Sequence, residues 1–416
     1  MKVCVIGSGG REHALAWRLS ISPSVTKVYA IPGSAAMSDC AELVGIDWQQ
    51  SDHLISFLKD NQVDLVVVGP EAPLVAGLAD VLNKVGIPVF GPSKAAAQLE
   101  GSKVFAKNLM KKYNIPTAAY GVFHKVDEAK TFIAQIGAPI VVKADGLAAG
   151  KGVVVAMTVD EANEAVEDML SGNRFGDAGS TVVIEEFMEG EEASLLAFVD
   201  SKTVVPMIAS QDHKRIFDGD KGANTGGMGT YAPAPVLTDA LRDEAMKTIL
   251  EPMVAAMEKE GMPYVGCLYA GLMITDEGPK VVEFNARFGD PETQVVLPLL
   301  DSDLGQIMMA CATGILTVDM VKWKDSSAAC VILASKGYPE TSSKGDVISG
   351  DIKQYDTTIV FHSGTKLVGE NYVTNGGRVL GVVGLGKDLR TALDRAYGRI
   401  EHIDFEGMQY RTDIGA

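Results

Sequence analysis

Residues 281–293 read VVEFNARFGDPET, and this run decides how the rest of the chain is interpreted. Two β-branched residues begin a strand, and its two-residue period then places Glu283, Asn285 and Arg287 on one face. Carboxylate and amide oxygens suit Mg²⁺, which also takes oxygens from bound phosphates, and an arginine fork suits a carboxylate or an acyl phosphate. The run therefore predicts magnesium nucleotide chemistry. Alone, it is equally compatible with a half-buried strand whose polar face meets water.

Composition is typical of a folded protein with several domains. A chain of 416 residues is too long to fold around one ordinary hydrophobic core, and its length indicates about three domains. Acidic residues outnumber basic ones by 54 to 37, which gives a formal net charge of −17. Because this charge repels nucleic acid and anionic membranes, and no basic patch offsets it, we expect neither as a partner.

Cysteine usage and the N-terminus bear on localisation. The five cysteines lie far apart and form no C-x-x-C pair, which indicates a reducing compartment. The chain begins with a strand that enters a glycine turn, unlike a signal peptide, and no apolar run approaches the ~18 residues of a membrane span. We therefore expect a cytoplasmic protein.

The first hundred residues alternate short apolar strands with helical stretches. A strand, a glycine loop and a helix open a βαβ unit, and the alternation then continues. This pattern predicts an open parallel α/β sheet of Rossmann-like character. The expected strands are 3–6, 28–31, 65–68 and 89–90, and the helical stretches include 52–59 and 74–85.

The middle of the chain predicts a small lid on a central domain. Residues 123–189 repeat strand and helix in small units, and Thr158 with Glu161 has capping-box spacing at a helix start. A long helix over 239–259 contains Pro252, where we expect a kink or break. The expected domains are an N-terminal substrate-binding domain (1–102), a central domain (103–122 and 190–325), the lid (123–189) and a C-terminal α+β domain (326–416).

The first glycine loop, GSGGREH (7–13), suggests dinucleotide binding, because glycines after a first strand let the backbone approach phosphate at a helix N-terminus. Glu12 stands where the third glycine of that fingerprint belongs, and the second strand ends without an acid for a ribose hydroxyl. The mismatch disfavours NAD and FAD. A smaller phosphorylated or sugar ligand remains open.

Two further segments have a nucleotide-binding and a plain structural interpretation. The loop KADGLAAGKGV (143–153) can fold over a triphosphate and donate backbone N–H groups, although alone it is better explained as a hairpin with a mobile tip. The run IEEFMEGEE (184–192) offers connector backbone to an adenine edge and carboxylates to a ribose, although a single acidic turn is more often solvated.

Together these segments resemble the ATP-grasp enzymes, which clamp ATP between two α+β subdomains, and within them the glycinamide ribonucleotide synthetase family. The resemblance implies an α/β and α+β multidomain protein with an N-terminal open parallel α/β sheet, an ATP-grasp core with a small lid, and a C-terminal α+β domain. The motifs that carry it are GSGGREHA (7–14), GPEAPL (69–74), QLEGSK (98–103), KADGLAAGKGV (143–153), SQDHKR (210–215), NTGGMG (224–229), FGDPETQ (288–294) and TNGGRVL (374–380).

The resemblance implies an ATP site and a metal site. Lys103 and Lys143 would contact the phosphates of the co-substrate ATP, where point charges offset the triphosphate. Glu283 and Asn285 would bind Mg²⁺ or Mn²⁺. Because residues 271–274 read GLMI where many relatives carry another acid, the number of metal ions stays open. The implied ATP-binding residues are Lys103, Lys143, Gly146, Gly150, Lys151, Gly152, Glu185, Glu186, Phe187, Met188 and Glu192, with the Glu186 and Met188 backbone at adenine and Glu192 at ribose.

The resemblance also implies the catalytic and substrate residues. Arg287 would steady an acyl phosphate, Asp290 would orient an attacking amine, and Lys143 completes the catalytic set. Glu71 would meet a ribose, whereas Lys366 and Arg378 would take a 5′-phosphate; taken alone, Glu71 and Arg378 are better explained as surface ion pairs. The implied substrate-binding residues are Gly9, Gly10, Glu71, Asp212, His213, Lys214, Asn224, Thr225, Gly226, Gly227, Met228, Arg287, Asp290, Lys366 and Arg378.

The implied reaction joins glycine to 5-phosphoribosylamine while ATP becomes ADP and phosphate, through glycyl phosphate, in purine biosynthesis. We expect a monomer or weak dimer whose partners are these small molecules. Two other functions stay open at this point. One is an ATP-grasp carboxylase or peptide ligase with another acceptor, and the other is a catalytically silent nucleotide-binding protein.

Overall fold

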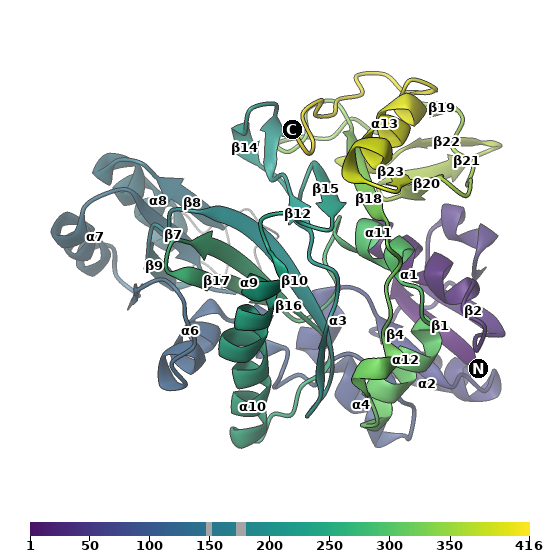
Figure 1. Ribbon diagram of the computed structural model, residues 1–416, viewed down its shortest axis with the longest axis horizontal. Coiled ribbons are helices and arrows are strands. Elements are labelled where there is room, and N and C mark those ends of the chain that lie inside the picture. The colour runs from purple at the N-terminus through teal and green to yellow at the C-terminus, as the bar shows by residue number, and fades with distance from the viewer. Residues whose placement is uncertain (147–151, 172–179) are drawn as a thin grey trace.

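A parallel five-stranded sheet opens the chain in the computed structural model, which describes residues 1–146, 152–171 and 180–416 (Figure 1). Its strand order is β3-β2-β1-β4-β5, and each neighbouring pair is parallel. This confirms the expected open α/β sheet. The elements are β1 (Lys2–Gly7), α1 (Gly10–Ser20), β2 (Lys27–Pro32), η1 (Ala35–Asp39), β3 (Glu42–Leu43), α2 (Ser51–Asp60), β4 (Leu65–Val68) and β5 (Val89–Phe90).

The helix expected over residues 74–85 is wrong as a single element. Helix α3 (Glu71–Ala76) ends at Gly77, whose φ of +98° is left-handed, and α4 (Leu78–Lys84) begins immediately after it. Glycine adopts this conformation without a steric penalty, so it ends one helix and re-aims the next. A similar break separates α5 (Gln98–Gly101) from α6 (Lys103–Lys112), because the intervening Ser102 is extended and caps α6 through its hydroxyl.

The central sheet is antiparallel and has the order β11-β10-β16-β17. Its strands are β10 (Glu191–Asp200), β11 (Val204–Pro206), β16 (Val265–Thr275) and β17 (Gly278–Asn285). Gly271 pairs with Glu283 and Leu272 with Val281, so Val282 is the extra residue of a β-bulge. Because of this bulge, Val281 and Phe284 both pack into the core while Glu283 and Asn285 face the opposite side.

The long helix expected over 239–259 is interrupted, as the proline predicted. Helix α9 (Asp239–Ala245) passes into a π-helical turn, η3 (Met246–Leu250), and then into α10 (Glu251–Lys259), which has Pro252 in its first turn. Proline lacks an N–H donor, and a widened turn accommodates its ring. Among the helices of the described ranges, none has the length and apolar character that a bilayer crossing requires.

The lid is a small unit with its own core (Figure 1, left). A four-stranded antiparallel sheet, β6-β9-β7-β8, packs against two helices through Ile133, Val142 and Val166. The predicted capping box is confirmed, since Glu161 N–H donates to Thr158 Oγ1 and Thr158 N–H donates to Glu161 Oε2. The elements are β6 (Tyr120–Phe123), α7 (Val126–Ile136), β7 (Ile140–Ala144), β8 (Val153–Ala156), α8 (Val159–Ser171) and β9 (Val182–Glu186).

The C-terminal sheet incorporates strands from the middle of the chain. Its order is β12-β15-β18-β23-β20, so β12 (Gln211–Asp212) and β15 (Gly229–Ala232) join strands beyond residue 326. The hairpin β13 (Arg215–Phe217) with β14 (Lys221–Asn224) lies between them in sequence. The remaining elements are α11 (Thr293–Val296), η4 (Leu297–Leu299), α12 (Leu304–Thr313), η5 (Val318–Met320), β18 (Ser327–Ala334), β19 (Ser349–Gly350), β20 (Thr358–His362), β21 (Thr365–Val368), β22 (Asn371–Thr374), β23 (Arg378–Gly386), α13 (Leu389–Ile400) and β24 (Ile403–Asp404).

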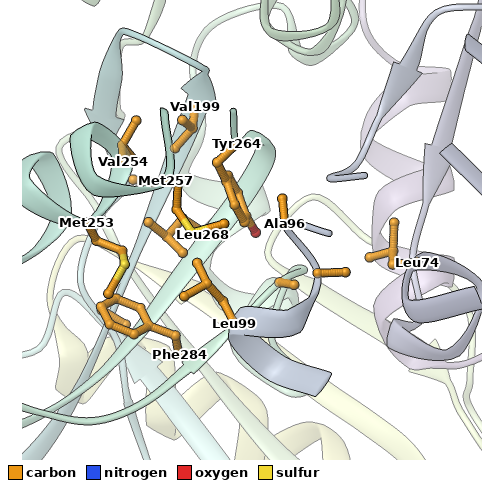
Figure 2. Close-up of a cluster of buried hydrophobic side chains, with 14 of the residues drawn as sticks. Leu74, Ala96, Leu99, Val199, Met253, Val254, Met257, Tyr264, Leu268 and Phe284 are labelled. Atoms are coloured by element: carbon orange, nitrogen blue, oxygen red, sulfur yellow. The ribbon is translucent and has the colours of Figure 1, made fainter. Parts of the chain in front are cut away.

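One hydrophobic core joins the N-terminal and central sheets, and it fixes the segment between them. Figure 2 shows Leu99 of α5 beside Leu268 of β16 and Phe284 of β17. Leu99 is 2% exposed, which anchors the short helix at its centre. The residue that follows it, Glu100, is therefore held at the end of β17, where the sequence predicted the site.

Candidate functional site

A cleft of about 800 Å³ collects most of the predicted site residues. Its lining comes from α6, the lid strands β7 and β9, the central strand β17, and the segment that contains β12 and the β13–β14 hairpin. The predicted residues in this lining are Glu71, Lys103, Lys143, Gly146, Gly152, Glu185, Glu186, Phe187, Met188, Glu192, Asp212, His213, Lys214, Asn224, Thr225, Gly226, Glu283, Asn285, Arg287, Asp290 and Arg378.

A buried carboxylate holds Lys143 in place. Lys143 Nζ lies 3.0 Å from Glu185 and 3.1 Å from the Val282 carbonyl, an oxygen that the β-bulge turns away from the regular ladder. Glu185 also receives Lys107, whose Nζ lies 3.0 Å from Oε2. All three charged side chains are nearly inaccessible to water. One carboxylate thus faces two ammonium groups, which locks the lysine that the sequence assigned to ATP phosphates.

The first testable consequence concerns pH. Burial lowers the pKa of Lys107 from 10.5 to about 8, although Glu185 opposes the shift. Between these values the unfolded chain binds more protons than the folded protein, so this group makes stability rise with pH. We expect the difference in unfolding free energy between pH 8 and pH 10 to be smaller in Lys107→Met than in the wild type, measured by urea denaturation.

The control for this prediction lies on the same helix. Lys111→Met removes an exposed ammonium and should leave the wild-type pH dependence intact. Equal pH dependence in the wild type and in Lys107→Met would contradict the assignment.

Lys103 is the second phosphate candidate and sits at the start of α6. Its Nζ donates to the Gly146 carbonyl at 2.9 Å, at the beginning of the glycine loop. Asp145 supports this arrangement, because its carboxylate accepts the Val104 N–H and the Ser102 hydroxyl. Burial lowers the pKa of Lys103, against the attraction of Glu283. Gly150 and Lys151, two other predicted ATP residues, lie outside the described residues.

The predicted adenine connector follows β9. The Glu186 N–H already donates to the Ala119 carbonyl at 2.9 Å, and its carboxylate accepts the Ala119 N–H. The Met188 backbone, the next candidate, lies in the cleft lining without a strand partner. Apolar side chains also contribute to the cleft lining; they are Leu99, Met110, Val141, Val155, Met273 and Phe284.

The metal candidates and Arg287 form a connected row at the end of β17. Asn285 Nδ2 donates to Glu283 Oε1, and Arg287 Nη2 donates to Asn285 Oδ1, both at 3.3 Å. This confirms that the three side chains share one face. Burial opposes ionisation, but the charges of Lys214 and Lys143 hold the pKa of Glu283 below its ordinary value. An ionised carboxylate next to an amide oxygen is a suitable donor pair for a hard divalent cation.

Glu100 orients Arg287, a role that motif inspection alone did not assign. Its Oε1 lies 2.7 Å from Arg287 Nη2, and its Oε2 accepts the Ala286 N–H at 2.8 Å. Glu71 adds a second carboxylate 3.5 Å from Arg287 Nε, and Arg11 lies 3.9 Å from Glu71. Although burial acts in the opposite direction, Glu100 and Glu71 raise the pKa of Arg287. The guanidinium is therefore fixed and charged.

The first glycine loop lies on the N-terminal side of the cleft, and its geometry explains why the dinucleotide fingerprint is broken. Glu12 Oε2 accepts the Gly9 N–H at 2.7 Å, so the carboxylate takes a donor that a pyrophosphate would need. A Cβ on Gly9 would lie 4.0 Å from Asp290 Oδ2, which places the loop near that predicted residue. Gly10 begins α1 next to Ser363.

Arg378 and Asp290 meet in the cleft lining close to this loop. Arg378 Nη1 donates to the carbonyls of Gly226 and Asp290, and its Nη2 lies 3.5 Å from Asp290 Oδ2. Although burial opposes ionisation, Arg378 holds the pKa of Asp290 below its ordinary value. Lys366 is not brought to this place: its side chain is exposed on β21, outside the described cleft lining.

The segment 210–229 forms one wall of the cleft. Lys214 Nζ lies 3.0 Å from Asp212 Oδ2 and 4.0 Å from Glu192 Oε2. Although burial opposes it, Asp212 raises the pKa of Lys214 well above its ordinary value. Thr225 donates from both its N–H and its hydroxyl to the Lys214 carbonyl, which closes the loop. The predicted residues Gly227 and Met228 support this wall from behind without lining the cleft.

The C-terminus fastens this wall, and sequence reasoning missed the contact. Arg411 is 1% exposed; its guanidinium donates to the Arg215 carbonyl, to Asp220 and to Asp413. Asp413 in turn accepts the Gly219 N–H at 2.8 Å. These contacts span nearly 200 residues of sequence, so no local pattern could reveal them. The β13–β14 hairpin is therefore tied to the end of the chain.

This clasp gives a second testable consequence. Arg411→Met should lower the free energy of unfolding by about 2 kcal/mol, because the hairpin loses several charge-assisted hydrogen bonds that are partly exposed to water. Urea denaturation measures this change. Arg390→Met, which removes an exposed arginine from α13, should cost less than about 0.5 kcal/mol. An equal effect of the two substitutions would contradict the role of Arg411.

Comparison with known proteins identifies relatives along the whole chain. Three family models match: phosphoribosylglycinamide synthetase N domain over residues 1–100, the ATP-grasp (A) domain over 101–293, and the C domain over 328–416. A protein of Halalkalibacterium halodurans is 52% identical over 416 residues, which cover 100% of this chain and 97% of the relative. A protein of Neisseria meningitidis is 53% identical with 100% and 98% covered. Both relatives carry the name phosphoribosylamine–glycine ligase.

Two solved structures resemble this chain in fold, one with substantial sequence identity and one with low sequence identity. The crystal structure of phosphoribosylamine–glycine ligase from Thermotoga maritima has a TM-score of 0.88 and 33% identity, and the two chains cover each other completely. The biotin carboxylase domain of a Hydrogenobacter thermophilus 2-oxoglutarate carboxylase has a TM-score of 0.75 but only 17% identity, with 98% of this chain and 91% of that chain covered. The second likeness therefore shows the fold alone.

Proposed function

The chain belongs to the phosphoribosylglycinamide synthetase family, and from that membership we propose that it joins glycine to 5-phosphoribosylamine through a glycyl phosphate intermediate. Its activity is that of an ATP-dependent ligase, as in the curated relatives that carry the same three domains. The product, glycinamide ribonucleotide, places the reaction in de novo purine biosynthesis. The domain bounds that the sequence suggested, and a cytoplasmic location, are part of the same proposal.

The observation that carries the proposal is the row Glu283, Asn285 and Arg287, which faces Lys103 and Lys143 across one cleft. A triphosphate requires cations, and a carboxylate that attacks it requires an arginine to offset its charge. These residues come from α6, the lid and the central sheet, so the charges meet only in the folded protein. A silent nucleotide-binding protein has no need for the Arg287 fork and its two carboxylate supports.

The chemistry follows two displacements. A glycine carboxylate oxygen attacks the γ-phosphorus, the bond to the β-phosphate oxygen breaks, and ADP leaves. The amine nitrogen of 5-phosphoribosylamine then attacks the glycyl carbonyl carbon, the bond to the phosphate oxygen breaks, and the nitrogen loses a proton. No covalent enzyme nucleophile is required, because positioning and charge neutralisation accelerate such transfers. Arg287 would steady the acyl phosphate, and Asp290 would orient the amine.

Glu283 and Asn285 would hold Mg²⁺ or Mn²⁺. Their oxygens fit a hard cation, and no group of three or more His, Cys, Asp or Glu side chains suited to a metal occurs in the described part of the chain. With these two protein ligands, phosphate oxygens and water would supply the other ligands of a bound ion. Bound there, the ion would neutralise charge on the transferring phosphoryl group.

The phosphoribosyl group would occupy the side of the cleft formed by Glu71, Asp290 and Arg378. Arg378 offers a fixed guanidinium to the 5′-phosphate, and Glu71 offers carboxylate oxygens to the ribose hydroxyls. Gly9 and Gly10 lie at the start of α1, but the Gly9 N–H already donates to Glu12, so an anion there would have to use other backbone N–H groups of this turn. Lys366 was predicted to join Arg378 at the phosphate, and its exposed position on β21 gives that assignment no geometric support.

A phosphate-release assay with each substrate omitted in turn tests the proposal. Phosphoribosylamine is unstable and is generated in the assay from ribose 5-phosphate and ammonia. We expect release only when ATP, a divalent cation, glycine and the amine are all present. Release that depends on bicarbonate or D-alanine in place of glycine would favour the carboxylase or peptide-ligase alternative. ATP binding without glycine-dependent turnover would favour the silent protein.

A further inference from the structure

Several carboxylates of the cleft face an arginine. Glu71 Oε2 lies 3.5 Å from Arg287 Nε, and Glu100 Oε1 lies 2.7 Å from Arg287 Nη2. Asp290 Oδ2 lies 3.5 Å from Arg378 Nη2. These negative charges are therefore compensated by the protein before any substrate arrives.

Glu292 lines the same cleft but has only neutral partners. Its Oε1 accepts hydrogen bonds from Tyr269 Oη at 2.8 Å and from Ser194 Oγ at 3.4 Å. The residue is 3% exposed. Among the residues that the structure describes, no basic nitrogen lies within 4.0 Å of its carboxylate. A buried carboxylate held by hydroxyls alone is costly unless a cation comes to it.

Local backbone geometry explains how this carboxylate reaches the cleft. A Cβ at Gly289 would lie 2.3 Å from Glu292 Oε2 and 2.9 Å from Tyr269 Cε2. Only a glycine residue at position 289 leaves room for the Glu292 side chain to pack back across the turn that follows β17. The turn therefore carries Arg287 and Glu292 within one short segment, and their charges interact.

The neighbouring wall has more carboxylates than ammonium groups. Asp212, Glu192 and Glu292 share Lys214, which lies 3.0 Å from Asp212 and 4.0 Å from Glu192. Burial, and then the charge of Asp212, raise the pKa of Glu292. Arg287 and Arg378 also attract Glu292, but they form ion pairs with Glu100 and Asp290. Lys214 is then the remaining cation for three carboxylates, a deficit that an additional cation would remove.

We propose that Glu292, together with Asp212, binds the ammonium group of the amino-acid substrate and so selects glycine over a plain carboxylate. The inference rests on the proposed function, because it assigns the amino end of the substrate whose carboxylate end reacts beside Arg287. An ammonium group offers three N–H donors and one positive charge. The two carboxylates have only acceptor oxygens and negative charge, so the ammonium complements them. Arg287 and Glu292 line the same cleft and their charges interact, so the carboxylate end of glycine would lie at Arg287 and its ammonium end at Glu292.

The test is Glu292→Gln, which keeps the shape and the acceptor for Tyr269 while removing the charge. We expect the KM for glycine to rise about a hundredfold, as for loss of a hydrogen bond to a charged group, with the KM for ATP changed less than about threefold. Glycolate, which has a hydroxyl in place of the ammonium, supplies a second readout. The preference for glycine over glycolate in kcat/KM should fall by a similar factor, which a merely structural role would not produce.

Further variants keep the test decisive. Asp212→Asn leaves Glu292 in place and should also raise the KM for glycine, and it serves if the first variant does not fold. Glu258→Gln, which removes an exposed charge from α10, should leave all parameters unchanged. Unchanged glycine KM and unchanged preference over glycolate in both cleft variants would overturn the inference. If that happens while the wild type turns over glycine normally, the proposed function is still supported. If the wild type shows no glycine-dependent turnover, both the proposed function and the inference about Glu292 fail.

Discussion

Glu283→Ala is expected to lower glycine-dependent phosphate release by at least about a thousandfold while leaving the fold intact. The side chain is one of two candidate metal ligands, and Lys214 and Lys143 hold the pKa of its partly buried carboxylate low, so it is ionised at neutral pH. If Glu283 holds the ion as proposed, phosphoryl transfer in the variant would lose the cation that neutralises the triphosphate. The stabilisation of the protein by Mg²⁺ and ATP in thermal unfolding should fall in parallel.

A matched control separates this effect from a general loss of charge. Glu277→Ala removes an exposed glutamate from the turn that precedes the same strand, where it pairs with Lys280. Its turnover should equal that of the wild type, and its unfolding free energy should change by less than about 1 kcal/mol. Near-normal turnover in Glu283→Ala would refute the assigned metal site.

The sequence allowed the elements to be predicted wherever the pattern was local and strong. The apolar runs of β1, β2, β4 and β5 are buried in a parallel sheet, and their continuous hydrophobicity indicates burial on both faces. The shared face of Glu283, Asn285 and Arg287 followed from strand periodicity. The helix break near Pro252 followed from the missing N–H donor. Each of these features depends on a few neighbouring residues.

The missed features depend on backbone conformation or on distant contacts. Gly77 splits the helix expected over 74–85, because a left-handed glycine can end a helix that composition alone would continue. The bulge at Val282 depends on the register with β16, which the sequence of β17 does not contain. Without that bulge Val281 would share the face of Glu283, and the carbonyl that receives Lys143 would be turned elsewhere.

The site itself shows the same division. Motifs indicated the residues predicted to serve as phosphate cations, metal ligands and substrate wall, and most of these residues line one cleft. Their supports were not evident, because Glu100 reaches Ala286 across 186 positions and Arg411 reaches Asp220 across 191. Glu100 and Glu292 lie inside quoted motifs, so the signal was present without an assigned role. Lys366 shows the reverse case: its assignment stays a prediction, and its side chain is exposed on β21 outside the cleft lining.

Glu185→Gln is expected to cost about 3–5 kcal/mol of unfolding free energy, the largest stability loss among these variants. The carboxylate lies 3.0 Å from both Lys107 and Lys143, and the three side chains are at most 4% exposed. A neutral amide cannot compensate two buried ammonium groups, which would then also repel each other. Turnover should fall as well, because Lys143 loses the partner that fixes it in the cleft.

A double-mutant cycle tests whether the loss arises from uncompensated charge. If Glu185→Gln destabilises by leaving two ammonium groups unpaired, removing one of them should restore stability, so Lys107→Met with Glu185→Gln should be more stable than Glu185→Gln alone. Loss of packing alone predicts the opposite order, because each substitution would add its own penalty. Urea denaturation of the four proteins at pH 7 distinguishes the two. Additive or greater destabilisation in the double variant would show that Glu185 does not act as the shared counterion, and the account of how Lys143 is held would fail with it.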